Sequence, residues 1–312
     1  MSEMKTSDRA KGRWLGILPS LGVDSRYLRN KHGPCPICGD GKDRFRFDNK
    51  SGNGSWICSY CGAGDGIELV KRINGWDFRK AVSEIDKLVG VAEFKPPKSE
   101  RSDQDKLRDM NAVWKVTVPI TSNDAAGRYL TARTGISSFP GDLRFADSLR
   151  YYDDDAGASW HPALVAMVRD ADGKPINLHR TYLSKSGMKA NVAEPRRAMP
   201  GGLPKGCAIR LASHSGVLGI AEGIETALSV TALFGVPCWS VINTTLMAQW
   251  IVPRDVRELI IFGDNDANFA GQNAAFALAH RIAKAGLSVT PRFPPVVGTD
   301  WNDVHAQNNL AA

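Results

Sequence analysis

The sequence has no apolar run of about eighteen residues, the length that a membrane-spanning helix requires. It also lacks a charged-then-apolar leader, a repeat of fixed period and a long low-complexity tract. The pattern G-x-x-x-x-G-K-[ST], by which many ATP-driven motors hold phosphate, is absent as well. We therefore expect a cytoplasmic protein with no membrane span, no secretory signal and no motor of that class.

Cysteine is scarce, with six in 312 residues, yet four of the six form two C-x₂-C pairs. Nineteen residues separate Cys35 and Cys38 from Cys58 and Cys61, and a glycine follows each pair. This spacing predicts two tight knuckles that close one tetrahedral Cys₄ zinc site per chain. Two disulfides are the alternative, but a cytoplasmic setting and the regular spacing argue against them.

The segment between the cysteine pairs alternates in polarity. Residues 43–48 are predicted as a strand that pairs with residues 55–58 across a Gly-Asn-Gly turn. Alternation places Arg44 and Arg46 on one face and two phenylalanines on the other. Two interpretations stay open here. The arginines are either simply solvated, or they contact DNA phosphates, with Trp56 available for stacking on bases.

Acidic residues follow the predicted strands of the last third of the chain. Four apolar runs are predicted as strands, at residues 217–221, 236–242, 256–262 and 287–290. Three of these runs are followed by acids, which are Glu222, then Asp264 and Asp266, then Asp300 and Asp303. In an open α/β sheet, ligand groups collect beyond the carboxyl ends of the strands, so we expect these acids to converge.

Carboxylates held close together resist ionising unless a cation neutralises them. Oxygen ligands without a nearby cysteine or histidine favour Mg²⁺ or Mn²⁺ over zinc. A single acidic turn is explained equally well as a helix cap, because Asp and Asn are common there. Three acid-bearing turns in one sheet favour a divalent metal site instead.

Charge is distributed unevenly along the chain. The net charge is +5 for residues 1–100 and +5 for residues 101–216, but −3 for residues 217–312. Five of the eight acids in the last segment belong to the turns described above. A basic first part with a local acidic cluster suits a polyanionic partner and a bound cation.

The order Glu222, Asp264-x-Asp266, Asp300 and Asp303 resembles the Toprim domain shared by bacterial-type DNA primases, topoisomerases and some nucleases. The last acids here read D-W-N-D, where many relatives have D-x-D, so either Asn302 or Asp303 takes the position of the final acid. The resemblance covers about the last hundred residues. It implies an α/β sheet domain at residues 217–312, with Glu222, Asp264 and Asp266 as metal ligands.

Residues 33–70 resemble the zinc ribbon at the amino terminus of phage and plasmid primases and primase-helicases. Two short helices, predicted at residues 67–73 and 78–88, complete a domain of residues 1–91. A proline-containing, polar stretch at residues 92–104 is the expected linker. The expected fold is therefore α/β overall, with a small zinc ribbon first and a Toprim sheet last.

Residues 105–216 between them are expected to be mixed α+β. Helices are predicted at residues 104–114 and 125–134, and a hairpin at 163–168 and 176–182. In bacterial-type primases, a basic subdomain in this position helps to hold template and nucleotides. The resemblance therefore implies nucleic-acid or nucleotide binding by four basic residues, Arg180, Lys189, Arg196 and Arg197.

A zinc ribbon, a basic region and a Toprim domain occur in this order in bacterial-type DNA primases. The resemblance implies template-directed synthesis of short RNA primers on single-stranded DNA from ribonucleoside triphosphates, with a separate helicase as partner. Glu222 is then a metal ligand or an acid-base group. A Toprim nuclease would use similar acids to cut DNA, and a non-enzymatic zinc-ribbon protein would only bind it. These two alternatives remain open.

Overall fold

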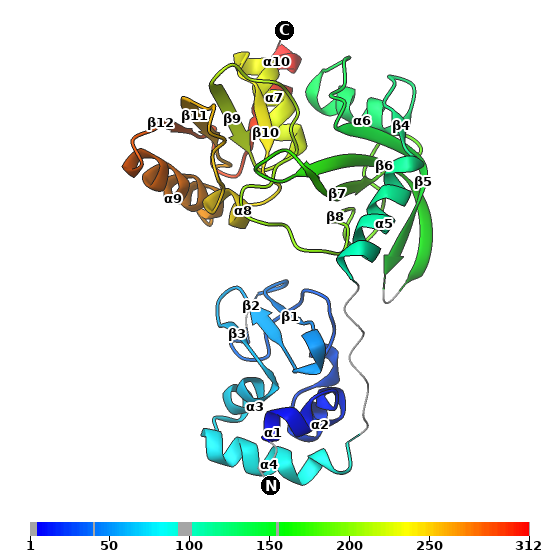
Figure 1. Cartoon of the computed structure of the whole chain (residues 1–312), viewed down its shortest axis with the longest axis vertical. Helices are drawn as coiled ribbons and strands as arrows, with labels where there is room; N and C mark the ends of the chain where they lie inside the picture. The colour runs from blue at the N-terminus through cyan, green and yellow to red at the C-terminus, as the bar shows by residue number, and fades with distance from the viewer. Residues whose placement is uncertain (1–4, 40, 93–101, 154–155, 312) are drawn as a thin grey trace. The chain divides into compact units, whose positions relative to one another are not determined.

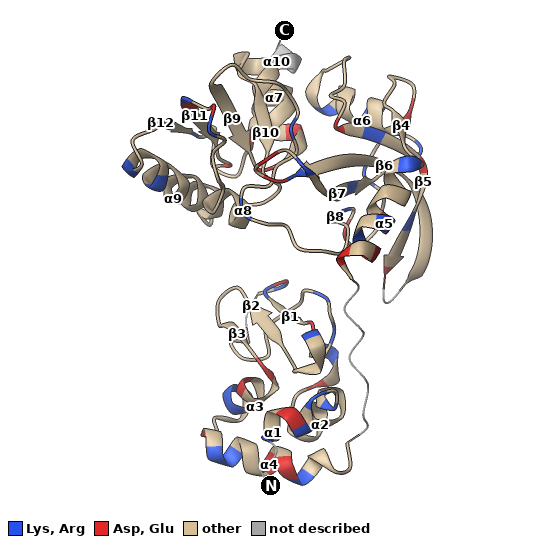
Figure 2. Cartoon of the chain, in the orientation of Figure 1, with Lys and Arg blue, Asp and Glu red and all other residues tan. Residues whose placement is uncertain are grey.

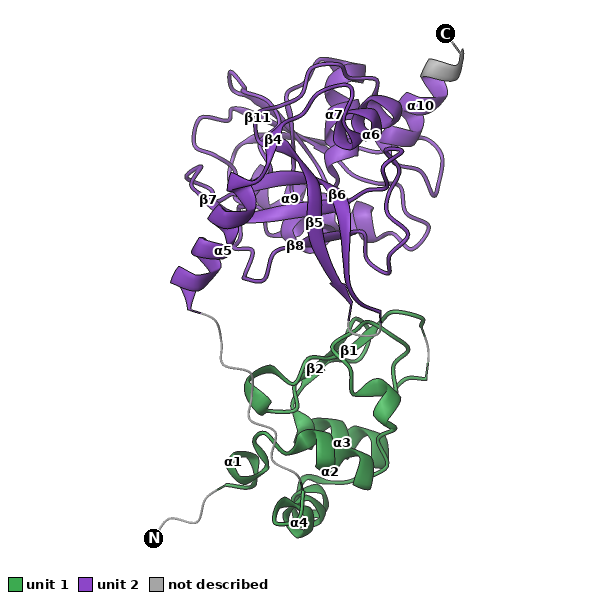
Figure 3. Cartoon of the chain, turned by 90° about the vertical axis from the view of Figure 1, so that its right-hand side faces the viewer, with its two compact units in different colours: residues 1–101 green, residues 102–312 purple. Residues whose placement is uncertain are grey.

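The computed structural model describes residues 5–39, 41–92, 102–153 and 156–311. It divides into two compact units, residues 1–101 and residues 102–312 (Figure 3). Most of the expected linker, residues 93–101, lies outside the described residues. No helix within the described ranges is long and apolar enough to cross a membrane.

The first unit is a small three-stranded antiparallel sheet with helices packed against it (Figure 1). Its strands are β1 (Phe45–Phe47), β2 (Trp56–Cys58) and β3 (Gly62–Gly64). Its helices are α1 (Thr6–Ala10), α2 (Trp14–Ser20), α3 (Gly66–Asn74) and α4 (Phe78–Val89), with single 3₁₀ turns at Ser25–Tyr27 and Lys50–Gly52. The predicted hairpin and the last two helices are confirmed, whereas β3 is an additional strand.

Local sequence explains where these helices begin. The Asp65 carboxylate accepts a hydrogen bond from the Glu68 amide at the start of α3, and the Asp77 carboxylate accepts one from the Lys80 amide at the start of α4. Figure 2 shows basic and acidic residues distributed along α4. Its buried residues, Ala81 and Ile85, pack into a cluster with the phenylalanines of β1.

The second unit contains two sheets. The first is antiparallel, in the order β4-β5-β6-β7-β8. Its strands are β4 (Val118–Pro119), β5 (Leu143–Asp153), β6 (Gly157–Arg169), β7 (Pro175–Tyr182) and β8 (Arg196–Ala198), and it is accompanied by α5 (Asp103–Lys115) and α6 (Ala125–Thr134). The predicted hairpin is the central pair β6 and β7. Strand β5 escaped prediction because a register shift between Ala146 and Leu149 interrupts its alternation.

The second sheet is parallel, in the order β10-β9-β11-β12. Its strands are β9 (Val217–Ala221), β10 (Cys238–Ser240), β11 (Glu258–Phe262) and β12 (Ser288–Arg292). Its helices are α7 (Ile224–Phe234), α8 (Thr244–Ala248), α9 (Ala270–Lys284) and α10 (Trp301–Ala311). All four predicted strands are confirmed.

The parallel sheet is covered on both faces, as the uninterrupted apolar runs predict. Ile260 and Phe262 of β11 pack in one core cluster with residues of α7, whereas Leu259 and Ile261 pack in another with residues of α9. Strand β9 carries no charged residue (Figure 2). Because β9 and residues 259–262 of β11 are apolar, the acidic side chains that follow these two strands lie in the loops at their ends.

Candidate functional site

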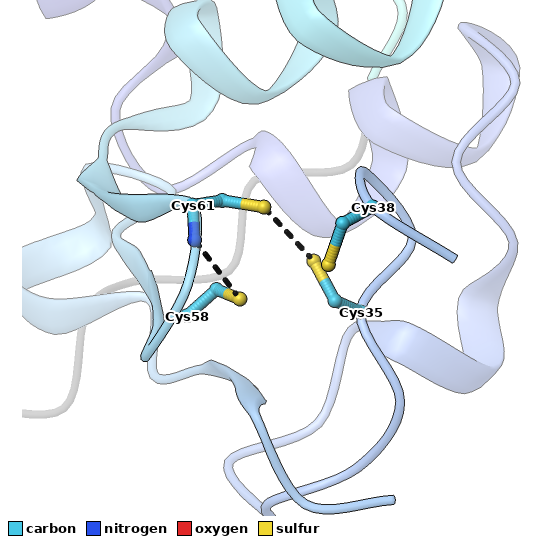
Figure 4. A group of neighbouring side chains, drawn as sticks. All are labelled: Cys35, Cys38, Cys58 and Cys61. Atoms are coloured by element: carbon cyan, nitrogen blue, oxygen red, sulfur yellow. Dashed lines mark hydrogen bonds between the residues drawn. The ribbon is translucent and has the colours of Figure 1, made fainter. Parts of the chain in front are cut away.

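The four paired cysteines form a compact group in the first unit (Figure 4). All four are free thiols, and their sulfur atoms lie within 4.8 Å of one another. The Cys35 and Cys61 sulfurs are 3.8 Å apart. Four Zn–S bonds of about 2.3 Å in a tetrahedron place two sulfurs about 3.8 Å apart, so the group fits a zinc ion and excludes the disulfide alternative.

Backbone geometry prepares these thiols to bind a metal. The Ile37 amide donates to the Cys35 sulfur and the Cys61 amide donates to the Cys58 sulfur, each at 3.4 Å. Both glycines that follow the pairs have left-handed backbone angles, with φ of +70° and +88°. Burial raises the pKa of Cys58, but hydrogen bonds from the Cys61 and Tyr60 amides and from the Cys35 and Cys61 side chains outweigh it and bring the pKa to about 7.

The hairpin between the knuckles has its arginines outside, as alternation predicts. Arg44 lies over the Tyr60 ring at 5.9 Å, and Arg46 lies 3.9 Å from the carboxylate of Asp48. The structure corrects the expectation for Trp56, whose side chain is 2% exposed and stacks on Phe45 in the core. Its indole donates to the Asp65 carbonyl oxygen, so this ring is unavailable to a base.

In the second unit, the sheet brings two of the predicted acids side by side. Strands β9 and β11 are parallel neighbours, and their last residues, Ala221 and Phe262, are paired in register. Glu222 follows the first of these residues directly, and Asp264 follows the second after one glycine. The two carboxylates therefore emerge from adjacent strands at the same edge of the sheet.

A bridge between two loops brings Asp300 to the same place. The Asn265 amide donates to the Thr299 carbonyl at 3.1 Å, and the Gly298 amide donates to the Asn265 carbonyl at 2.6 Å. The Asn265 side chain donates to the Pro294 carbonyl and accepts a hydrogen bond from Gln272. The position of Asp300 thus depends on Asn265, which sequence reasoning did not single out.

The cluster is electrostatically strained when no cation is bound. Burial, followed by the charges of Glu222 and Asp300, raises the pKa of Asp264 to about 7. Burial also raises the pKa of Glu222, and the charge of Asp266 raises it further. The pKa of Asp300 is raised mainly by burial. Each carboxylate thus resists ionisation in the presence of the others.

These acids fit a divalent cation. One oxygen of Asp264, Oδ1, is buried and has no hydrogen-bond partner among the described residues. Within the same ranges, the cysteines are the only group of three or more potential ligands close enough together to hold a metal ion, so the acids do not enclose an ion by themselves. Mg²⁺ commonly binds through one or two carboxylates and keeps several waters, which matches this open arrangement.

The remaining two predicted acids also stabilise local structure. The Asp266 carboxylate accepts a hydrogen bond from the Gly271 amide at the start of α9. Asp303 and Asp300 cap α10 reciprocally, because each carboxylate accepts a hydrogen bond from the other's amide. Asn302, the other candidate for the final acid position, is 2% exposed and donates to the Arg133 carbonyl and the Ser229 hydroxyl.

Acidic and basic side chains line one cavity of about 410 Å³ in the second unit. Its acids are Glu222, Glu225, Asp264 and Asp300, and its cations are Arg133, Lys189, Arg196 and Arg197. Lys189 and Arg196 therefore lie with the acids, whereas Arg197 borders the cavity but directs its guanidinium to the Tyr151 ring. The charged groups of Arg133 and Lys189 have no hydrogen bond or ion pair with any described residue. Burial lowers the pKa of Lys189.

The fourth predicted cation, Arg180, is not among the described residues that line the cavity. It donates to the Tyr182 hydroxyl at 3.0 Å and to the Ala198 carbonyl at 3.1 Å. Its neighbours in β7, His179 and Thr181, do line the cavity, because alternate side chains of a strand point to opposite faces. Arg180 thus supports the antiparallel sheet from the far side.

Sequence reasoning missed two residues of the cavity wall, Arg133 and Glu225. Arg133 lies in the last turn of α6, where nothing in the sequence pattern distinguishes it from a solvated arginine. Glu225 is 5% exposed, accepts a hydrogen bond from the Tyr129 hydroxyl and lies 3.8 Å from Arg196. Glu225 lies three residues after Glu222 in the same motif, so the sequence could have indicated that its side chain lies near the site.

A zinc knuckle pair and an acid-lined parallel sheet define the class of protein. Residues 30–67 match the family model described as the zinc-binding domain of primase-helicase, and residues 217–310 match the model of the Toprim domain. Together, a zinc ribbon of the primase-helicase kind and a Toprim domain support a Toprim-type DNA primase with an amino-terminal zinc ribbon. Residues 104–211 match a domain family of unknown function, so the role expected for the basic middle region remains a prediction.

Solved primase structures are similar to this chain. The zinc-binding and RNA polymerase domains of the Aquifex aeolicus primase share 15% identity at a TM-score of 0.45, covering 99% of this chain and 85% of that one. The primase fragment of the bacteriophage T7 primase-helicase shares 14% identity at a TM-score of 0.40, covering 89% and 94%. A DNA primase domain from Pseudomonas aeruginosa shares 16% identity at a TM-score of 0.33, covering 50% of this chain and 51% of that one.

Proposed function

We propose that this primase synthesises short RNA primers on single-stranded DNA from ribonucleoside triphosphates. The observation that carries the proposal is the cavity in which carboxylates and unpaired cations face each other. A nucleoside triphosphate carries phosphates that require cations, and its transfer requires a metal that carboxylates hold. The basic side chains of the cavity can supply the cations, and the acids at the sheet edge can supply the carboxylates.

We propose that Glu222, Asp264 and Asp266 hold the divalent cation, with Asp300 beside them. The chemistry supplied by a bound Mg²⁺ or Mn²⁺ is neutralisation of the triphosphate charge and stabilisation of the leaving pyrophosphate. The raised pKa of Glu222 also suits acceptance of the proton that the attacking 3′-hydroxyl loses. Asp303 has an indirect role in this scheme, because it holds Asp300 through the cap of α10.

The cations are proposed to bind the phosphates of the incoming nucleotide. Arg133 and Lys189 suit this task because no described residue already occupies their charged groups. Arg196 is partly committed to Glu225, and Arg197 donates to the Tyr151 hydroxyl and the Tyr152 carbonyl. Arg196 and Arg197 therefore stabilise the cavity wall through these contacts, whereas the charged groups of Arg133 and Lys189 remain available to bind phosphate.

Template binding is proposed for the basic face of the zinc ribbon. Arg44 and Arg46 project from β1 and its preceding residue, opposite the buried phenylalanines. Phosphate contacts of this kind position a strand without reading its bases. We further propose that a separate helicase supplies the single strand, and that the chain serves replication of a phage or plasmid.

The direct test is incubation with single-stranded DNA, Mg²⁺ and the four ribonucleotides. The proposal predicts short labelled RNA whose formation stops when ribonucleotides or Mg²⁺ are omitted. Degradation of the DNA without ribonucleotides would instead identify a nuclease, and binding without any product would identify a non-enzymatic protein. Lys189→Ala should raise KM for the nucleotide, whereas Lys205→Ala, which changes an exposed lysine outside the cavity, should not.

A further inference from the structure

Strands β5 and β6 continue together beyond the rest of their sheet. Strand β7 pairs with β6 only from Ala163 onward, whereas β5 also pairs with the preceding residues of β6, from Gly157 to His161. Figures 1 and 3 show the two strands extending as a pair. We call residues 149–153 and 157–161 the hairpin arm. Its two faces carry different side chains.

One face of the arm belongs to the core. Tyr151 is 2% exposed, and its ring meets those of His161 and Tyr182 edge to face at 6.2 and 5.1 Å. The opposite face carries Arg150, Tyr152 and Trp160. Tyr152 is 52% exposed and Trp160 is 64% exposed. All eight tryptophans lie within the described ranges, and Trp160 alone is more than a third exposed.

These exposed side chains are neighbours. Arg150 and Trp160 are paired directly across the two strands, and Tyr152 lies diagonally from Trp160. The Arg150 guanidinium lies 5.6 Å from the centre of the Tyr152 ring. Two exposed aromatic faces beside a cation offer base stacking and phosphate attraction together, which is the combination that proteins use for unpaired strands.

We propose that Arg150, Tyr152 and Trp160 form a stacking platform for the unpaired bases of a single strand. A polyanionic occupant agrees with the net charge of +5 in residues 101–216. The platform shares a face of the sheet with the cavity. Trp160 lies four residues before Leu164 in β6, so the two share a face, and Leu164 pairs with Thr181, which lines the cavity. A strand that leaves the cavity along this face reaches the arm.

The platform is a binding site in its own right and does not depend on primer synthesis. Its test therefore uses the full chain without Mg²⁺ or nucleotides. Fluorescence anisotropy of a short labelled single strand should show Trp160→Ala and Tyr152→Ala each weakening binding about fivefold or more. Trp160→Phe should retain most of the affinity. Phe276→Ala is the matched control, because that ring is 54% exposed but lies on α9.

Two further measurements separate stacking from other roles of the arm. A strand with abasic sites keeps its phosphates, so the wild type and Trp160→Ala should bind it equally. The slope of log affinity against log salt concentration should be the same in Trp160→Ala and Tyr152→Ala as in the wild type. In Arg150→Ala its magnitude should fall by about 0.7 if that residue neutralises one phosphate. Single-stranded RNA and DNA arms of the assay show which strand is preferred.

Equal binding of the normal strand by the wild type, Trp160→Ala and Tyr152→Ala would overturn the proposal. So would an equal loss of affinity for normal, abasic and duplex DNA, because such a loss does not depend on unpaired bases. Unchanged melting temperatures of the ring variants verify that each fold is intact. If Trp160→Ala melts early, Trp160→Lys provides a second variant that keeps a long side chain and removes the ring.

Discussion

At the scale of single residues, the carboxyl group of Asp264 is the most strongly perturbed acid in the cavity. One of its oxygens is buried without a partner among the described residues, and burial together with four neighbouring acids raises its pKa to about 7. Such a group destabilises the folded chain when it ionises without a cation. A neutral side chain would be more stable at this strand end in the absence of a cation.

This perturbation predicts a pH-dependent stability for the metal-free protein. Between about pH 4 and pH 7, the folded Asp264 carboxyl keeps a proton that the unfolded chain has released. The free energy of unfolding should therefore fall as pH rises through this window. Asp264→Asn should fall less steeply and should be the more stable variant at pH 8.

Urea denaturation in a chelator at several pH values measures this difference. Added Mg²⁺ should stabilise the wild type most above pH 7, since the cation competes with the proton for the same oxygens. Identical pH profiles for the wild type and Asp264→Asn would show that the Asp264 carboxyl ionises without cost, and would contradict the electrostatic account of the site.

Single-residue patterns also show what the sequence made predictable. Cys58 has to face the metal, and residues two apart in a strand share a face, so Trp56 has to point inward as well. The sequence therefore contained enough information to predict that Trp56 is buried, although its aromatic side chain also suggested stacking on bases. Arg133 was not predictable. Its role arises only when α6 packs against α7 and places its last turn beside the sheet edge.

At the scale of elements, two loops at the sheet edge act as one unit. The bridge between Asn265 and Thr299 fixes the loop after β11 to the segment that carries Asp300. Strand positions were predictable from their apolar runs. This bridge was not, because it joins residues that are 34 positions apart and leaves no local pattern.

Asn265→Ala tests the side-chain hydrogen bonds that support the loop carrying this bridge. The substitution removes the side-chain hydrogen bonds to Pro294 and Gln272 and leaves every carboxylate in place. Displacement of Asp300 should lower kcat about tenfold to a hundredfold, because small misplacements of reacting groups are costly. Zinc content should be unchanged. Full activity of Asn265→Ala would contradict a positioning role for Asn265.

The zinc knuckles are the second decisive element. We expect one zinc per chain, because a Cys₄ site contributes directly to the folding of so small a sheet. Cys58→Ser should empty the site and abolish the cooperative unfolding of the first unit, which metal analysis and thermal melting will record. Full zinc content in this variant, or a disulfide between Cys35 and Cys38 in protein purified under reducing conditions, would contradict the assignment.

The exposed face of the hairpin between the knuckles has its own prediction. Binding to single strands should weaken steeply with salt, with a log-log slope of about −0.7 for each phosphate neutralised. Arg44→Ala and Arg46→Ala should each reduce that slope. Lys50→Ala is a suitable control on the following turn. A slope unchanged in the Arg44 and Arg46 double variant would remove this face from the DNA interface.

At the scale of the whole molecule, charge and chemistry are separated along the chain. The basic first two thirds supply the zinc ribbon and the cations of the cavity, whereas the acidic last third supplies the metal-binding edge. The cavity forms where the antiparallel sheet meets the parallel one, so neither region has a complete site alone. The sequence predicted the two chemical halves separately. Their meeting in one cavity depends on packing across more than a hundred residues, which local patterns do not encode.

The central claim is that this cavity performs metal-dependent nucleotidyl transfer. The most direct measurement is the rate of RNA primer formation by Asp264→Asn in Mg²⁺, compared with the wild type at equal zinc content and equal DNA binding. The account predicts a fall of roughly a hundredfold or more, since the substitution keeps the size of the side chain and removes only its charge. Asp303→Asn should be milder, because asparagine retains a capping oxygen. Primer formation by Asp264→Asn at the original rate would show that the carboxylate cluster is structural.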